Sequence, residues 1–560
     1  MITPCSPGPE GAVFRAFPVF ALIWGVTTLV HQLAFTFWAE TWQGWLLTAA
    51  AVQVIFQPAC VLRFALLVGT ALLHLWDKLP FVPNHILFEG MLHVTMGVAL
   101  VEWLVRGKGF RGLLDARWGP TWGWLLLAGA AVVKGLYVYV PGMPRGLVLD
   151  YGTTLLVPGA FTLWLRGLPV VEAGGEEWFS RFAPVMRAAV VIMYGWAGIQ
   201  KLNWDYLNPE TSCAAVFHRE IAACLGWLIP TGSWTLRGAI WGSYAFEFGI
   251  PVLLMFGRTR RVGFAAAVVF HLWLSIHPAA GIFSYSSLMF ALLAVFLPVE
   301  WGARLLGLWR RQLAWLGRGD EACGRRLARW AFVVLFFAAL LCQVALYLFV
   351  QRDQTVFKTA NRIGFAVFWV WGCWLGGCYL LASRGAGERR AALPLPFGWR
   401  WTAAWVGLLP VLVNGLMPWI GSRTETSYSM FSNLRSEGAG NHLFLRRADV
   451  FALQTDLVQV VASEPDVFAP GVRPRSIQHF GSAGHFILPW FEFRRLISEV
   501  KGDFRVRYRR GEAKEVLQLG RSHGEVFGDV RAFEPLPYLE GKLLWSRRLK
   551  SLEEPMCCTH

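Results

Sequence analysis

The sequence predicts an all-α bundle of transmembrane helices followed by a small mixed α/β domain outside the membrane. Hydrophobic residues make up 55% of the 560 positions, charged residues only 16%, and the mean hydropathy is +0.44. Soluble globular domains carry roughly 25% charged residues, so this composition indicates that much of the surface faces lipid. Apolar runs long enough to cross a hydrocarbon core of ~30 Å recur through the first three quarters of the chain. Each run must be helical, because lipid offers no partner for backbone polar groups.

We expect about 11–13 spans, since the boundaries of the runs are soft and two of them are short. The first run lacks a small-residue cleavage site, so we interpret it as a helix rather than a signal peptide. The runs lie near 17–37, 44–57, 59–76, 84–105, 121–140, 147–166, 184–201, 237–256, 262–279, 283–299, 330–351, 364–383 and 399–420.

Basic residues indicate the orientation of these spans. The formal net charge is +16, and four strongly basic loops fall on one face if the spans alternate, at 106–117, 258–261, 304–329 and 384–400. The positive-inside rule makes that face cytoplasmic, which places the N-terminus inside and the C-terminal domain outside. The excess charge belongs to these loops, so we do not expect nucleic-acid binding. The high Arg, Ala and Gly content suggests a bacterial cell (inner) membrane.

The chain divides into three predicted regions. These are a transmembrane core at 1–300, additional transmembrane helices at 301–420 and an extracytoplasmic soluble domain at 421–560. In the last region Phe504, Val506 and Tyr508 alternate with polar residues, which predicts a strand. The stretch 490–500 predicts a short amphipathic helix.

The ten cysteines show no metal-ligand spacing, and no metal site is expected. Cys213 and Cys224 share one predicted outer loop and can pair if it faces an oxidising compartment, which the sequence leaves open.

Ionisable residues inside or beside apolar runs are costly, so each is a functional candidate. Lys201 closes such a run, in which Gly195, Ala197 and Gly198 permit close helix packing. Loss of hydration disfavours the charged form of a lysine and makes its amine available as a base. The alternative is an interfacial lysine whose charged end extends to the lipid headgroups.

Four other polar residues are candidates. Asn84 and His85 open the fourth predicted span, where an imidazole suits proton handling or substrate orientation, and Asn84 suits a helix N-cap. Glu247 lies in mid-span and must be protonated, paired or face a cavity; the alternative is a structural hydrogen bond across the bundle. His271 lies in the next span, and its alternative role is that of a core histidine.

Four segments, in the same order, resemble the vitamin K-dependent gamma-glutamyl carboxylase family. Its bacterial relatives are grouped as horizontally transferred transmembrane domain (HTTM) proteins. The resemblance covers roughly residues 15–300 well and 421–445 less closely. The segments are Tyr194–Leu207, similar to the one that bears the family's catalytic lysine; Leu75–Lys78 with Asn84 and His85; Phe270 and His271 with Gly281–Tyr285; and Ser427–Arg435 with Asn441 and His442.

The resemblance implies a membrane enzyme that couples oxygenation and epoxidation of a reduced quinone to carboxylation of a glutamyl or other substrate. Reduced vitamin K or another quinol would be oxidised, with O2 and CO2 as co-substrates. Lys201 would be the base, and Asn84 and His85 would orient groups or move protons. Expected partners are membrane lipid, the quinone, and a peptide or protein substrate approaching from outside. The resemblance further implies a substrate- or quinone-binding set of Glu247, His271, Gly281, Phe283, Ser284 and Tyr285.

Two departures keep a second hypothesis open. Gln200 stands where the family has a lysine next to the catalytic one, and the external portion is smaller than the propeptide-binding portion of animal members. Under this second hypothesis, the chain is a non-catalytic membrane scaffold or transporter that keeps the fold. Lys201 separates the two hypotheses, because an enzyme needs a neutral amine there and a scaffold would tolerate glutamine or arginine.

Overall fold

The computed structural model describes most of the chain. The described residues are 14–35, 41–106, 159–162, 164, 170–277, 280–349, 354–384, 402–468, 486–511, 513–556 and 558. The predicted span at 121–140 lies outside these residues, and so does most of the one at 147–166. Most of the predicted basic loops at 106–117 and 384–400 also lies outside them.

The predicted fold class is confirmed. Within the described ranges, six helices are long and apolar enough to cross a membrane. The C-terminal region contains a small antiparallel sheet with helices. The six are α1 (Ala16–Ala34), α4 (Asn84–Arg106), α8 (Gly175–Gln200), α11 (Ser233–Met255), and parts of α15 (Glu321–Phe349) and α16 (Gln354–Ser383).

Several other predicted spans form helices that are short for a full crossing. The helix α2 (Trp42–Phe56) has 15 residues, which corresponds to a length of about 22 Å. A hydrocarbon core is ~30 Å thick, so α2 alone does not cross it unless the bilayer becomes thinner around it. The other short elements are α12 (Arg260–Leu274), α13 (Ala280–Leu293) with η3 (Ala294–Phe296), and η5 (Ala403–Gly407) with α17 (Leu408–Leu416). The helix α3 (Val61–Lys78) covers the predicted run at 59–76.

The chain forms two compact units that cut across the three predicted regions. Unit 1 comprises Met1–Thr70, Met96–Arg187 and Leu253–Ala404. Unit 2 comprises Ala71–Thr95, Ala188–Val252 and Trp405–His560. The ends of α3, α4, α8 and α11 therefore belong to different units.

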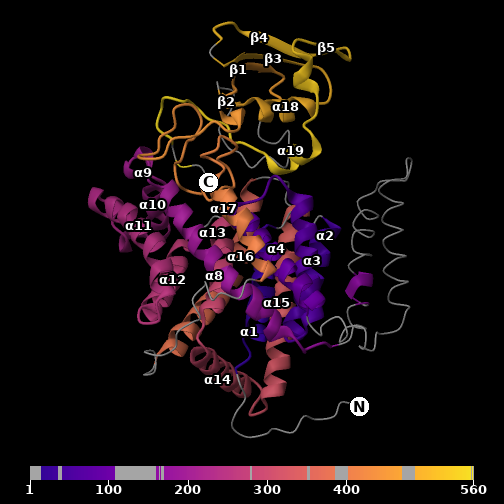
Figure 1. Cartoon of the computed structure of the whole chain (residues 1–560), viewed down its shortest axis with the longest axis vertical. Helices are drawn as coiled ribbons and strands as arrows, with labels where there is room; N and C mark the ends of the chain where they lie inside the picture. Colours follow the sequence, from indigo (N-terminus) through magenta and orange to yellow (C-terminus); the bar gives the residue numbers. More distant parts are fainter. Residues whose placement is uncertain are drawn as a thin grey trace. The chain divides into compact units, whose positions relative to one another are not determined.

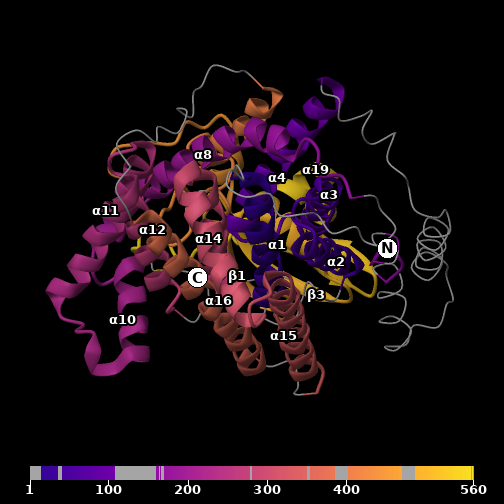
Figure 2. The ribbon, with the colours of Figure 1, turned by 90° about the horizontal axis from the view of Figure 1, so that it is seen from below.

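Unit 1 is a helical bundle built around α1. This helix packs against α2, α13, α15 and α16, and Figure 2 shows it next to α2, α15 and α16. Its aromatic side chains Phe20 and Trp24 are fully buried. The predicted basic loop at 304–329 is mostly helical, since α14 (Val299–Leu316) occupies its first part and α15 its end. The helix α14 packs on α15 and α16.

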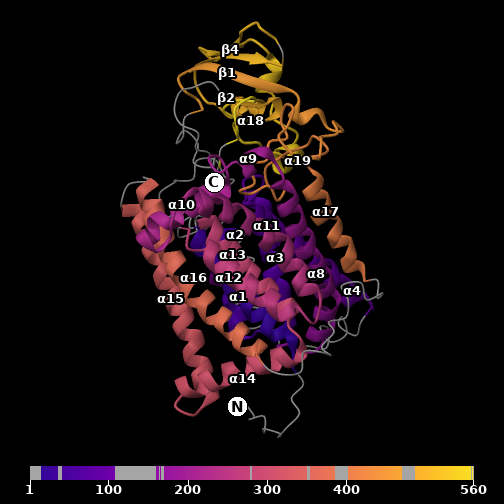
Figure 3. The same ribbon diagram turned by 90° about the vertical axis from the view of Figure 1, so that its left-hand side faces the viewer.

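Unit 2 contains a five-stranded antiparallel sheet in the order β2-β1-β3-β4-β5 (Figures 1 and 3). The predicted strand is β3 (Phe504–Arg510), in which alternate side chains are buried, and the predicted amphipathic helix is α18 (Trp490–Ser498). Phe493 and Ile497 of α18 share one core with Val506 of β3. The remaining strands are β1 (Leu457–Glu464), β2 (Phe486–Pro489), β4 (Leu517–Ser522) and β5 (Glu525–Phe527).

Candidate functional site

Lys201 follows directly after the last residue of α8 and is buried. Its Nζ lies 2.9 Å from Oε1 of Glu247, which α11 carries. Only 5% of Lys201 and 8% of Glu247 is exposed. The ammonium also donates to the carbonyl of Ala197, near the end of α8, over 3.4 Å. Glu247 is thus paired, which is one of the three states expected for a carboxyl in mid-span.

The Phe248 ring of α11 packs directly against the backbone of α8 at Gly198. A Cβ atom added to Gly198 would lie 2.6 Å from Cζ of Phe248, the residue after Glu247. A Cβ on Gly195 would meet nothing within 4 Å. Of the two glycines predicted to favour close packing, Gly198 is therefore the one whose missing side chain leaves room for the Phe248 ring.

Tyrosines surround the pair. The Lys201 ammonium lies 5.9 Å from the ring centroid of Tyr206, which is on α9 (Trp204–Leu207). The Tyr244 hydroxyl donates to the Lys201 carbonyl over 2.6 Å, and the two tyrosine rings meet edge to face. Burial raises the pKa of Tyr206, and the Glu247 carboxylate raises it further. Tyr206 therefore stays neutral, and its hydroxyl forms a 2.6 Å hydrogen bond with Ser243.

One oxygen of Glu247 remains available. Oε1 contacts Lys201, whereas Oε2 is buried and has no hydrogen-bond partner among the described residues. A carboxylate accepts hydrogen bonds at both oxygens, and an unsatisfied buried acceptor is costly. A donor from a ligand or a water molecule would satisfy this atom.

A loop at 426–433 adjoins the segment around Lys201, and several of its residues have left-handed backbone conformations. Thr426, Tyr428, Phe431 and Asn433 all have φ between 53° and 67°, although none is glycine. Such conformations cost roughly 1–3 kcal/mol each and persist only where the surroundings hold them. Four such residues in one short loop indicate that contacts with its surroundings fix the backbone conformation of this loop.

Hydrogen bonds hold this loop between the lysine segment and the start of α4. The Gln200 amide donates to the Ser427 carbonyl over 2.6 Å. The next residue, Tyr428, donates its backbone N–H to Oδ1 of Asn84 over 2.9 Å. Asn84 is the first residue of α4, but its side chain anchors the loop instead of acting as the predicted N-cap. His85, the next residue in the sequence, is also buried.

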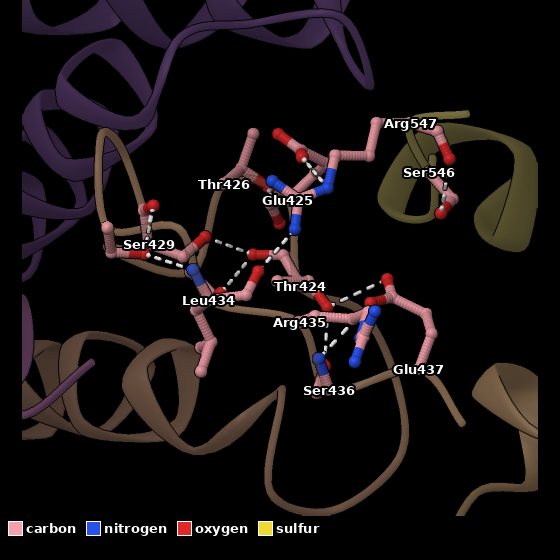
Figure 4. A network of polar contacts seen from close by, with 12 residues as sticks. Thr424, Glu425, Thr426, Ser429, Leu434, Arg435, Ser436, Glu437, Ser546 and Arg547 are labelled. Atoms are coloured by element: carbon pink, nitrogen blue, oxygen red, sulfur yellow. Dashed lines mark hydrogen bonds and ion pairs between the residues drawn. The ribbon is translucent and has the colours of Figure 1, made fainter. Parts of the chain in front are cut away.

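The loop also contains a buried polar network (Figure 4). The Thr424 hydroxyl donates to Glu437 over 2.9 Å, and the Arg547 guanidinium lies 3.3 Å from Glu425. Burial raises the pKa of Glu425, and this effect is opposed mainly by Arg547. Burial lowers the pKa of Arg423 to about 10. The ion pair of Glu425 with Arg547 attaches the loop to the C-terminal segment.

The last described residues of the chain reach back to the lysine segment. The backbone N–H of Met556 donates to Asp205 over 2.8 Å, and its carbonyl accepts from Asn433 over 2.7 Å. Cys558 forms a disulfide with Cys213 at the start of α10 (Cys213–Leu225). Cys558 is therefore covalently attached 12 residues after Lys201.

This disulfide corrects the possible pairing of Cys213 with Cys224, because Cys224 is a free thiol. The two cysteines lie near opposite ends of α10, about 16 Å apart along the helix axis. Disulfide-bonded residues have Cα atoms closer than about 7 Å, so the helix prevents that pairing.

A family model described as HTTM domain matches residues 180–301. The chain contains an HTTM domain. This is the domain of the vitamin K-dependent carboxylase family, so the predicted resemblance is confirmed. Comparisons with curated proteins and with solved structures found no match.

The HTTM domain also contains the other predicted substrate-binding residues, which lie in unit 1. His271 is buried on α12, and its ring centroid lies 5.3 Å from that of Tyr285 on α13. The Ser284 carbonyl is 3.0 Å from Nε2 of His31. Phe283 packs edge to face on Phe365. Gly281 lies at the start of α13, and the binding role of this group stays a prediction.

Sequence reasoning missed several residues that shape the lysine site of the HTTM domain. The buried tyrosines Tyr206 and Tyr244 gave no local signal, because aromatic residues are common throughout the chain. Asp205 and Asn441 lie in two of the segments that resemble the carboxylase family, but the sequence alone predicted no role for either residue. The structure joins them by a 2.6 Å hydrogen bond from the Asn441 amide to the Asp205 carboxylate.

Proposed function

We propose that this protein is a multi-pass membrane enzyme that couples oxygenation and epoxidation of a reduced quinone to carboxylation of a glutamyl or other substrate. The observation that carries the proposal is the buried pair of Lys201 and Glu247 in an HTTM domain. An ionisable pair among apolar helices is costly and is typically retained for function.

The pair provides the chemistry that the first step needs. A lysine in water has a pKa of about 10.4 and is almost wholly protonated at neutral pH. The Lys201 proton can pass across the 2.9 Å contact to the Glu247 carboxylate, which leaves a neutral amine on the lysine. We therefore assign the base function to the pair as a unit, which holds one acidic proton at rest and two after it takes a proton from a quinol hydroxyl. The O–H bond of the quinol breaks, its electron pair stays on oxygen, and the ammonium of Lys201 balances the negative charge.

The surroundings suit an aromatic alcohol. Oε2 of Glu247 lacks a donor, which a quinol hydroxyl would supply. Tyr206, Tyr244 and Phe248 add aromatic surface next to the pair, and the rings of Tyr244 and Phe248 are stacked. Reduced vitamin K or another quinol is the proposed substrate, with O2 and CO2 as co-substrates. Asn84 is assigned a positioning role through the loop, and His85 remains the candidate for proton handling.

The proposed compartment follows from charge and from the disulfide. We place the basic loops in the cytoplasm of a bacterium and the C-terminal domain outside the cell membrane. A disulfide between Cys213 and Cys558 is compatible with this side, because disulfides persist in oxidising compartments. A peptide or protein substrate would approach from there.

A second candidate is a scaffold that keeps the fold without catalysis. The same ion pair favours it, since a salt bridge between α8 and α11 also serves as a structural crosslink. The two candidates differ in whether any quinol is consumed.

The decisive experiment incubates the purified protein with a reduced quinone, oxygen and labelled bicarbonate. An enzyme forms quinone epoxide and, with a glutamyl peptide present, a labelled product. The Lys201→Ala variant is the control for background oxidation. Epoxide formation no faster than with this variant would exclude the enzyme and leave the scaffold.

A further inference from the structure

We propose that the segment 444–451 inserts into the surface of the lipid bilayer and forms the edge over which a lipid-dissolved quinol reaches Lys201. The first part is independent of the proposed function, whereas the second part rests on it. The partner is the interface of an anionic bilayer, where aromatic and aliphatic side chains lie beneath the headgroups and arginines contact phosphates.

Four apolar side chains of the segment are exposed. Phe444 is 75% exposed, Leu445 41%, Val450 68% and Phe451 48%. Exposing such side chains to water is unfavourable by roughly 25 cal/mol per Å². Contiguous exposed apolar surface typically marks a site of contact with a partner or a membrane.

Backbone hydrogen bonds connect the segment to the ends of apolar helices. At its start, Leu443 donates to the carbonyl of Leu202, the residue after Lys201, over 2.9 Å. Near its end, Phe451 donates to the carbonyl of Ile420 over 2.9 Å, shortly after α17. The ends of apolar helices lie at the membrane surface, so the segment has the depth of the interface.

The charges of the segment agree with an anionic surface. Arg446 is exposed, whereas Arg447 is paired with Asp449. This leaves Arg446 beside the apolar side chains with a charge that no acid in the segment balances. A row of exposed apolar side chains with an arginine is the composition of interfacial segments.

The same contacts place the segment beside the lysine site. Asn203 and His442 form an isolated antiparallel bridge, and His442 lies 2.8 Å from the carbonyl of Ile199. Trp204, which is also exposed, donates its backbone N–H to Asn441 over 3.2 Å. Trp204 and Phe444 thus follow closely on the two residues of this bridge, which lies two residues after Lys201. A lipophilic quinol leaving the bilayer here has a short path to the pair.

The depth of the segment is measured with an environment-sensitive fluorophore at single cysteines. Phe444→Cys and Val450→Cys are prepared with the exposed free cysteines replaced by serine and the disulfide retained. The protein is reconstituted in nanodiscs of phosphatidylcholine and phosphatidylglycerol. Both labels should shift to the blue and lose intensity when lipids carrying a shallow nitroxide are included. Val530→Cys is the matched control, since Val530 is a 60% exposed valine of the C-terminal domain.

Labels at 444 and 450 that stay water-exposed would overturn the proposal, and a protein partner would then have to cover the patch. Quenching at 530 equal to that at 444 would also overturn it, because the effect would not belong to this segment. The route is tested with Phe444→Asp, which should raise KM for a long-chain quinol but leave KM for a short-chain, water-soluble quinol unchanged. If KM for both stays unchanged while the labels are quenched, the segment binds lipid and the route is wrong. If the wild-type protein oxidises no quinol, the proposed route is wrong. The depth measurement still decides whether the segment inserts into the bilayer.

Discussion

The Nζ of Lys201, directly after α8, and Oε1 of Glu247, on α11, are 2.9 Å apart, although the two residues are 46 residues apart in the sequence. Neither side chain has appreciable exposure to water. The same pair therefore contributes to the stability of the protein, to the packing of α8 against α11 and to the proposed chemistry.

Replacement of Lys201 tests its chemical role. Lys201→Ala should abolish quinol oxidation while the protein stays folded, and a small exogenous amine should restore part of the rate. Lys201→Arg should not restore it, because guanidinium cannot release its proton at working pH. Epoxide formation is the measurement. Full activity of Lys201→Arg would mean that the residue is an electrostatic anchor.

The pair also predicts a pattern of stabilities. Glu247→Leu or Lys201→Met alone leaves a buried charge without its partner and should cost about 3–5 kcal/mol. The double variant removes both charges, so it should be more stable than either single one. Thermal unfolding in one detergent gives all four values. Strictly additive losses would contradict a direct interaction between the two side chains.

Gly198 should be sensitive to the smallest possible addition. A methyl group at this position meets the Phe248 ring, so Gly198→Ala should separate α8 from α11 and destabilise the protein by about 1–3 kcal/mol. Gly195→Ala is the matched control in the same helix, where the added methyl has free space. Equal melting temperatures of the two variants would show that the approach of α11 does not depend on Gly198.

The disulfide between Cys213 and Cys558 should stabilise unit 2. Cys213→Ser frees the end of the chain and should cost about 2–5 kcal/mol, the usual effect of removing a native disulfide. Cys224→Ser, in the same helix, should have little effect because Cys224 is a free, exposed thiol. Mass spectrometry under non-reducing conditions should recover the two peptides linked. Recovery of a Cys213–Cys224 link would reverse the assignment.

Topology is tested from outside intact cells with single cysteines at exposed positions. Position 514 of the C-terminal domain should react with an impermeant reagent, whereas position 315 in α14 should react only after permeabilisation. The reason is the clustering of arginine on one face of the predicted spans. The opposite labelling pattern would invert the orientation.

Local properties of the sequence determined the class of the protein and several elements. Membrane-length apolar runs and period-two alternation depend only on neighbouring residues, so α8 and β3 could be predicted directly. Lys201 and Glu247 could each be selected, because a charge within an apolar run is visible in the sequence alone. The four ordered segments predicted a resemblance, which the match of an HTTM domain to residues 180–301 supports.

The tertiary structure decided which residues act on one another. It paired Lys201 with Glu247, joined Cys213 to Cys558 at a sequence separation of 345, and bound the loop at Tyr428 to Asn84. These contacts depend on how closely helices approach and how a distant segment folds back. Such approach is set by packing, for example by the missing side chain at Gly198, and not by the local pattern around either partner.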